Sequence, residues 1–298
     1  MVTIGVDAHK AVHQALALDA VGTVRGSWRG ANTPHQWQHL LAWAATFPGA
    51  RRWGGHPPGE GAWNYGRGLA PFLVTHGEHV YEVNPRWTAQ GRRRARKPGK
   101  NDWLDAPAVA KLVRDEGATL PRVAAEDQTA VLDLLVIERE TALREATRLR
   151  NQIHQLLLQV DPDYKAHLPS LTSKAGLSAV EHDTTATTNL LQAQRAAAIR
   201  RVAQRLQLVL EPAAALEGEV CAMAAAHYQP LTELNGVGLF TAGALAGILG
   251  PGRRFRSEGQ LAADAGVAPF EASSAGLVRH RLNRGGHRRL NAILYRIA

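Results

Sequence analysis

The longest helical periodicity in the chain lies between residues 126 and 226. One helical stretch runs from Glu126 to Asp161, and a second, rich in alanine and leucine, runs from Thr188 to about Ala226. Residues 170–183 between them read as a loop. Two long helices joined by a break predict an antiparallel hairpin. Apolar residues in the first stretch step by four and three, as in a coiled-coil seam: Ala142, Ala146, Leu149, Ile153, Leu156 and Val160. This seam fits a contact between two copies and packing within the chain equally well.

Before this region the sequence alternates between short strands and helices. The predicted order is strands over Val2–Val6, Gln14–Leu18 and Thr23–Trp28, a helix from Pro34, a strand within 51–59, a helix over Trp63–Thr75, a strand over His79–Val83 and a helix over Asp102–Glu116. Residues 51–59 make a poor strand because glycine and proline dominate them. The order predicts an α/β domain with a mixed sheet.

The last part of the chain, from Leu231, is predicted to be mainly helical. The expected elements are helices over Thr241–Leu249, Leu261–Ala265 and His287–Ile297, with an irregular or hairpin-like segment over Val267–Leu282. We therefore divide the chain into domains at 1–120, 121–228 and 229–298.

Several simple features bear on location. A single cysteine, Cys221, excludes an intrachain disulfide and suits a reducing cytosol. The first residues lack the basic and apolar pattern of a signal peptide. The longest apolar segment, Leu239 to Gly250, is too short to span a bilayer. We expect a cytoplasmic protein with no membrane partner.

Positive charge is concentrated in two segments. The chain has a formal charge of +9, but residues 92–100 carry six positive charges and no acid, and residues 251–298 carry a net +6. The remainder is slightly acidic. Clustering of this kind favours a polyanionic partner, most often nucleic acid, over a general solubility effect.

Four acidic residues stand out by their placement. Asp7 ends the first predicted strand, Glu60 opens a helix, and Asp102 and Asp105 share one face at the start of another helix. Each alone is explained as a turn former or as a helix-start acid favoured by the helix dipole. Together, at one edge of an α/β sheet, they would repel one another unless they bind a hard cation such as Mg²⁺. A magnesium site for phosphoryl transfer is therefore the preferred interpretation.

Three further segments could contact or attack phosphates. The basic loop lies directly before Asp102 and is expected to bind phosphate through Arg92, Arg93, Arg94, Arg96, Lys97 and Lys100. The glycines of the 234–238 turn, Gly236 and Gly238, fit either a helix-hairpin-helix contact with phosphate or a tight helix–helix turn. Ser274 lies in an arginine-rich segment and could attack a phosphodiester, although its residue type alone favours a hairpin tip. The nearby arginines expected to bind nucleic acid are Arg279, Arg281, Arg284, Arg288 and Arg289.

In combination these segments resemble the DEDD transposases of the insertion-sequence 110 type, a family that includes the Piv-like DNA invertases. The matching motifs, in the family's order, are Gly5–Lys10, Glu60–Gly66, Val83–Pro85, Lys97–Ala106, Leu234–Leu249, Ala265–Pro269, Ser273–Ser274 and Val278–Leu290. The resemblance covers nearly the whole chain.

The resemblance implies a RuvC-like, ribonuclease-H-type N-terminal domain, a coiled-coil linker and a C-terminal transposase domain. It implies that Asp7, Glu60, Asp102 and Asp105 are a catalytic Mg²⁺-binding tetrad, and that Ser274 is the nucleophile that forms a transient link to DNA. The implied partners are DNA, a structured non-coding guide RNA and further copies of the chain, as a dimer or tetramer. The implied setting is the bacterial cytoplasm, at the nucleoid.

The sequence departs from the family pattern at three places. Ala275 replaces the usual glycine after the serine, residues 54–59 replace a hydrophobic strand, and family members usually continue past Ala298, so we expect a shortened C-terminal domain. Two alternatives to a transposase follow. One is a RuvC-like nuclease that uses water, and the other is an inactive remnant that still binds nucleic acid.

Overall fold

The computed structural model describes the chain except for residues 56–67, 84–104, 118, 183–188, 253–254, 256, 272, 274–276, 283–285 and 298. It divides into two compact units. The first comprises Met1–Asp127 and Gly250–Tyr295, and the second comprises Gln128–Leu249 and Arg296–Ala298. The predicted division at 1–120, 121–228 and 229–298 stays a prediction.

A five-stranded mixed sheet organises the N-terminal part of the first unit, as the sequence predicted. Its order is β3-β2-β1-β4-β5. The strands are β1 (Val2–Ala8), β2 (Val12–Leu18), β3 (Val24–Ala31), β4 (Arg51–Gly55) and β5 (Val80–Glu82). β2 pairs antiparallel to both β1 and β3, whereas β4 pairs parallel to β1 and β5 pairs parallel to β4. The sheet with its helices confirms the α/β class.

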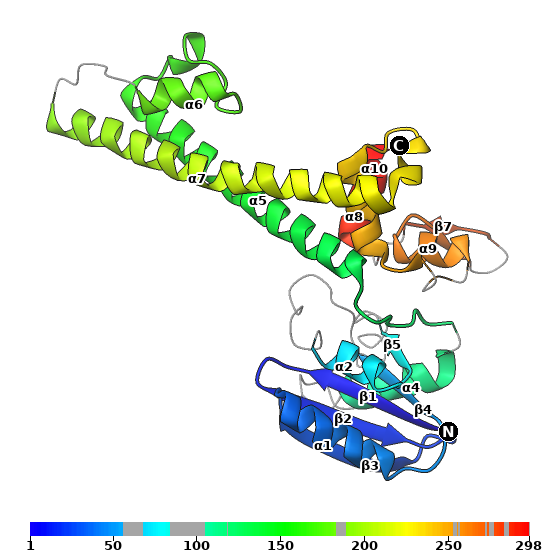
Figure 1. Ribbon diagram of the computed structural model, residues 1–298. Coiled ribbons are helices and arrows are strands. Elements are labelled where there is room, and N and C mark those ends of the chain that lie inside the picture. The colour runs from blue at the N-terminus through cyan, green and yellow to red at the C-terminus, as the bar shows by residue number, and fades with distance from the viewer. Residues whose placement is uncertain are drawn as a thin grey trace. The chain divides into compact units, whose positions relative to one another are not determined.

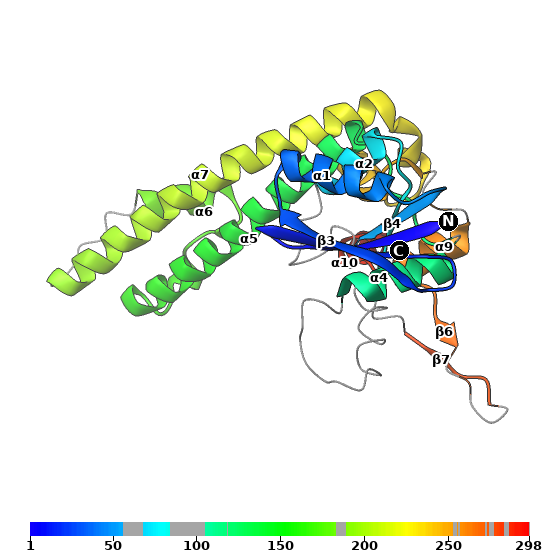
Figure 2. The ribbon, with the colours of Figure 1, turned by 90° about the horizontal axis from the view of Figure 1, so that it is seen from below.

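Helices cover both faces of this sheet (Figure 2). The helices α1 (Pro34–Ala45) and α2 (Leu69–Thr75) lie on one face, and α4 (Asp105–Glu116) lies on the other. Residues Ile4 and Val6 of β1 belong to the apolar core on the α1 side. Thr33 caps α1, because its hydroxyl accepts a hydrogen bond from the Gln36 amide.

The strand predicted within residues 51–59 is confirmed at Arg51–Gly55, which form β4 despite the poor strand composition of the segment. The strand lies between β1 and β5, so its backbone groups are paired on both sides. Trp53 is completely buried and anchors the strand in the core. Glycine at position 54 is required by packing, since a Cβ there would lie 2.4 Å from Val113 Cγ2 of α4. Tertiary contacts therefore outweigh the low strand propensity of glycine.

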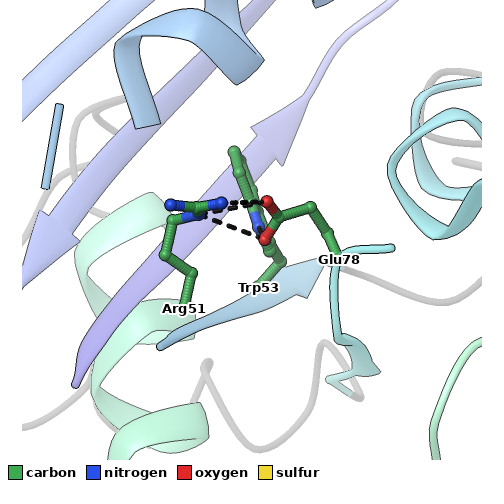
Figure 3. A network of polar contacts seen from close by, with 3 residues as sticks. All are labelled: Arg51, Trp53 and Glu78. Atoms are coloured by element: carbon green, nitrogen blue, oxygen red, sulfur yellow. Dashed lines mark hydrogen bonds and ion pairs between the residues drawn. The ribbon is translucent and has the colours of Figure 1, made fainter. Parts of the chain in front are cut away.

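A polar network fixes the beginning of β4 (Figure 3). The Arg51 guanidinium donates to both carboxylate oxygens of Glu78, with Nη2 at 2.6 Å from Oε1. The indole Nε1 of Trp53 donates to Glu78 Oε2 at 2.7 Å. The Glu78 side chain is only 8% exposed. This network joins β4 to the segment that leads into β5.

The second unit is built around two long helices, α5 (Gln128–Val160) and α7 (Leu190–His227), which run side by side (Figure 1). The seam of α5 packs within the chain, against α7 and the short helix between them. Ala146, Leu149 and Ile153 are buried as predicted, but the next fully buried position is Leu157, with Leu156 only partly buried. A step of four after Ile153 suits an ordinary helix of 3.6 residues per turn. The coiled coil itself stays a prediction.

The loop expected at 170–183 was wrong in part. Residues Lys174–Glu181 form α6. Ser173 caps this helix, because its hydroxyl accepts a hydrogen bond from the Gly176 amide at 3.1 Å. Leu177 and Val180 bury one face of α6 against α5 and α7. Short helices of this kind are stabilised by tertiary packing, which a local pattern does not reveal.

The remaining helices complete both units. α8 (Leu239–Leu249) packs on α5 and α7, following the 3-10 turn η3 (Gln229–Glu233); a second 3-10 turn, η2 (Tyr164–Ala166), follows α5. α9 (Glu258–Asp264), the antiparallel pair β6 (Phe270–Glu271) and β7 (His280–Arg281), and α10 (Arg288–Ile297) form the C-terminal segment. The pair β6–β7 supports the hairpin-like alternative for Val267–Leu282 over the irregular one. Among the described residues, none of the helices has the length and apolar character needed to cross a membrane.

Candidate active site

Asp7 is a buried carboxylate near the end of a buried strand. It lies in β1, only 5% exposed, after the apolar residues Ile4 and Val6. Its backbone pairs with Gln14 of β2. His9 Nε2 donates to Asp7 Oδ2 at 3.0 Å. Burial of a carboxylate is costly without polar partners, and the His9 contact supplies one; the role of Asp7 as a metal ligand stays a prediction.

The close packing of α4 on β1 places the first turn of the helix, which contains Asp105, beside Gly5. A Cβ on Gly5 would lie 2.1 Å from the Ala106 carbonyl oxygen, so the helix backbone touches the strand at this glycine. Side chains alternate along a strand, so Asp7 lies on the same face as Gly5. Asp105 directly precedes Ala106, in the first turn of α4. The predicted helix start was Asp102; the described part of the helix begins at Asp105.

A pair of glycines makes this approach possible. Gly5 of β1 is the register partner of Gly54 of β4. Both lie under α4, because a Cβ on Gly54 would come within 2.8 Å of Val109 Cγ1 and closer still to Val113. The sequence reasoning missed this role, although a glycine in the middle of an apolar strand is a known signal of close approach by another element.

Oxygen ligands at Asp7 and Asp105 fit the chemistry of a magnesium site. Hard cations prefer carboxylate oxygens and keep several waters. Glu60 and Asp102, the other two predicted ligands, lie outside the described residues. Within the described part of the chain no group of three or more histidine, cysteine or acidic residues is placed to hold a metal. The half of the tetrad that is described is compatible with Mg²⁺, and the tetrad as a whole stays a prediction.

His9 was not among the predicted site residues. Its side chain is 46% exposed, and its contact with Asp7 places it at the edge of the site. The sequence signal that could have identified His9 is its position two residues after Asp7, the aspartate at the end of the first predicted strand.

The predicted nucleophile and most of the predicted phosphate ligands cannot be compared with the structure. Ser274, the basic loop residues Arg92, Arg93, Arg94, Arg96, Lys97 and Lys100, and Arg284 all lie outside the described residues. Beside Ser274, the hydroxyl of Ser273 accepts a hydrogen bond from the Arg279 amide at 3.2 Å. Arg279 and Arg281 are both exposed; Arg281 lies in β7, and Arg279 directly precedes that strand.

The other predicted arginines lie at the start of α10. Arg288 is exposed and Arg289 is half-buried, and both have polar or electrostatic partners within the protein. They are expected to contribute less to nucleic-acid binding than the two hairpin arginines. Their assignment as ligands stays a prediction.

The two glycines of the turn before α8 have different surroundings. Gly236 adopts φ +80°, a left-handed conformation that favours glycine, and a Cβ there would lie 2.9 Å from the Ile297 carbonyl oxygen. A Cβ on Gly238 would meet nothing within 4 Å. This glycine directly precedes Leu239, the first residue of α8. Packing therefore explains Gly236, whereas the open space at Gly238 is compatible with an approaching phosphate.

A buried carboxylate near the end of β1 and an acidic residue in the first turn of α4 are groups of the kind that ligate hard cations. Comparison with known proteins makes the class specific. Residues 4–162 match the model of the IS110-type DEDD transposases, described as "Transposase". Residues 228–298 match the model described as "Transposase IS116/IS110/IS902 family". The chain belongs to the IS110 family of DEDD transposases.

A curated relative agrees with this assignment. The "Insertion element IS110 uncharacterized 43.6 kDa protein" of Streptomyces coelicolor (strain ATCC BAA-471 / A3(2) / M145) is 30% identical over an alignment of 246 residues, which covers 66% of this chain. The chain spans 59% of the length of that relative.

Proposed function

We propose that the protein is a DNA recombinase that moves an insertion sequence, through Mg²⁺-dependent strand cleavage and a transient bond between Ser274 and DNA. The observation that carries the proposal is the buried Asp7 carboxylate beside the start of α4, on a chain whose two ends both match transposase models. The sheet order β3-β2-β1-β4-β5 supports a ribonuclease-H-type domain, and the clustered basic charge supports a nucleic-acid substrate.

The residues of the chain have distinct roles in this proposal. Asp7 and Asp105, with Glu60 and Asp102, hold the metal. A bound Mg²⁺ supplies Lewis-acid stabilisation of charge on the scissile phosphate. The Ser274 oxygen attacks phosphorus, its bond to phosphorus forms as a phosphate–deoxyribose bond breaks, and the hydroxyl proton ends on the released deoxyribose oxygen. A second DNA hydroxyl then reverses the step and completes the exchange. Arginines of the hairpin, Arg279 and Arg281, hold phosphates of the backbone.

We propose that a structured non-coding RNA from the element selects the DNA, and that several copies of the chain act together. Recognition through base pairing leaves the protein to bind backbones, which suits exposed arginines better than a base-reading helix. The proposed setting is the bacterial cytoplasm at the nucleoid.

A covalent-trapping experiment tests the proposal. The protein is incubated with Mg²⁺, the element's flanking RNA and DNA that spans the element junction, and a denaturing gel is examined for a protein–DNA band. Ser274→Ala and Asp7→Asn should abolish the band. Ser273→Ala is the matched control, since it removes the neighbouring hydroxyl and should keep the band.

Each outcome has a definite meaning. A band that needs Ser274, Mg²⁺ and RNA supports an RNA-guided serine recombinase. Cleaved DNA without a band supports a nuclease that uses water, and RNA binding without either product supports an inactive remnant. A band that persists in Ser274→Ala excludes this serine as the nucleophile.

A further inference from the structure

Gln14 is a buried polar residue whose side-chain oxygen has no partner in the part of the chain that the structure describes. The residue lies in β2 and is only 7% exposed, and its Oε1 atom is buried without a hydrogen-bond donor. The sequence analysis did not single it out. An unpaired polar oxygen away from water costs free energy, so its presence in a folded protein calls for a group that pairs with it.

The position of Gln14 in the sheet places it beside the candidate active site. It is the register partner of Asp7 in the antiparallel pair of β1 and β2. Side chains directly opposite one another in such a pair lie on the same face, with their Cβ atoms about 4.5–5.5 Å apart. α4 packs on both strands and covers this face (Figure 2). The Gln14 amide and the Asp7 carboxylate are therefore neighbours on the face that α4 covers.

Asp7 and Gln14 together supply two kinds of hard oxygen. An ionised carboxylate and an amide carbonyl both accept hydrogen bonds, so the two oxygens cannot pair with each other. Both are oxygen donors of the kind that Mg²⁺ prefers. A cation bound at Asp7 would supply the positive partner that the Gln14 oxygen lacks.

Arg29 is the charged residue on the other side of Gln14. It lies in β3 as the second register partner of Gln14, so Asp7, Gln14 and Arg29 form a row across three strands. Arg29 is exposed, and its guanidinium does not bond to Gln14 Oε1, since that oxygen has no partner among the described residues. The side of the row that holds Asp7 is therefore where a partner for this oxygen is expected.

We propose that Gln14 is a further metal ligand, whose Oε1 binds the divalent cation held by Asp7. The inference rests on the proposed function, because it takes Asp7 as a magnesium ligand. A neutral amide adds an oxygen without adding another negative charge to the predicted acidic tetrad. Because β2 is paired with a strand on each side, its backbone holds Gln14 in a fixed position, as a preorganised ligand requires.

The test measures urea unfolding of the full chain in EDTA and in a series of Mg²⁺ concentrations. A cation that binds the folded chain raises the free energy of unfolding, and the dependence on concentration gives its Kd. Gln14→Met removes the oxygen at similar size, whereas Gln14→Glu keeps an oxygen at the same place. Thr3→Val is the matched control, because Thr3 Oγ1 is also buried without a partner among the described residues but lies about 13 Å from Asp7 along β1.

We expect Gln14→Met to weaken Mg²⁺ binding about tenfold, as the loss of a group that supports a metal commonly does. In EDTA this variant should be at least as stable as the wild type, because the unpaired oxygen is gone. Gln14→Glu should bind Mg²⁺ at least as tightly as the wild type. Thr3→Val should leave the affinity for Mg²⁺ unchanged.

Two results overturn the inference while the proposed recombinase stands. One is an unchanged Mg²⁺ affinity in Gln14→Met, which would leave Gln14 with a structural role alone. The other is an equal loss of affinity in Gln14→Glu, which would show that the amide NH₂ rather than the oxygen matters. In both cases Asp7→Asn should still abolish Mg²⁺ binding. A wild type that Mg²⁺ does not stabilise at any concentration overturns the metal site of the proposed function and the inference together.

Discussion

Replacing Gly5 by alanine tests whether the contact between α4 and β1 holds the candidate site together. The added Cβ would lie 2.1 Å from the Ala106 carbonyl oxygen and 2.4 Å from the Ala110 amide nitrogen. Both obstacles are helix backbone, so no side-chain rotation relieves them. Overpacking of a core costs about 1–3 kcal/mol, and a backbone obstacle belongs at the upper end, about 3 kcal/mol. Alanine recovers about 0.5–1 kcal/mol through lower unfolded-state entropy. We expect a net loss of about 2 kcal/mol in the free energy of unfolding.

The assay is urea unfolding followed by tryptophan fluorescence, since Trp53 is completely buried in this domain. Gly55→Ala is the matched control, because a Cβ there meets nothing within 4 Å, and it should be as stable as the wild type or slightly more stable. Displacement of α4 would also move Asp105 relative to Asp7, so Gly5→Ala should weaken Mg²⁺ binding in calorimetry while Gly55→Ala should not. Equal unfolding midpoints for the two variants would refute the reasoning.

Three further substitutions test other contacts. Glu78→Gln removes the charge from the Arg51 network and should lower the free energy of unfolding by about 2 kcal/mol in urea titration, whereas Glu145→Gln, in an exposed ion pair, should change it by less than about 0.5 kcal/mol. Burial lowers the pKa of His13 below 6.5, so as the pH drops the unfolded chain binds this proton before the folded chain does. The free energy of unfolding should therefore fall as the pH drops below 6.5. In His13→Leu the unfolding midpoint, measured against pH, should decline less over this range. Gly247→Ala places a Cβ 2.6 Å from a backbone nitrogen of α5 and should lower the melting temperature. Gly218→Ala in α7, where a Cβ meets nothing within 4 Å, should raise the melting temperature by improving helix propensity. A higher melting temperature for Gly247→Ala than for Gly218→Ala would contradict the packing of α8 on α5.

The sequence predicted much of the architecture because strong local patterns survive in the fold. The long helices α5 and α7 and the order of strands and helices up to α4 appear where periodicity placed them. The pair β6–β7 lies within the segment that the sequence left as irregular or hairpin-like. Weak local signals left β4 poorly defined in the sequence and α6 unpredicted. β4 exists because two neighbouring strands pair with it, and α6 exists because α5 and α7 bury its apolar face.

For the site, residue type and position made Asp7 and Asp105 candidates, together with Glu60 and Asp102, and their role as ligands stays a prediction. A carboxylate at a strand end and another in a first helical turn carry their own chemical meaning. The position of α4 relative to β1 could not be predicted from the sequence, because it depends on the two glycines that let the helix touch the sheet. The hydrogen bond from His9 to Asp7 likewise depends on the turn that follows β1.

The sequence by itself therefore determined the classes of element, the concentration of positive charge and the acidic residues suited to a metal. The tertiary structure decided which face each element buries, how closely α4 approaches β1 and that Gln14 lies buried beside Asp7. The physical reason is one of range. Periodicity, capping and charge act between residues near in the chain, whereas burial and close approach depend on pairs of residues that only folding brings together.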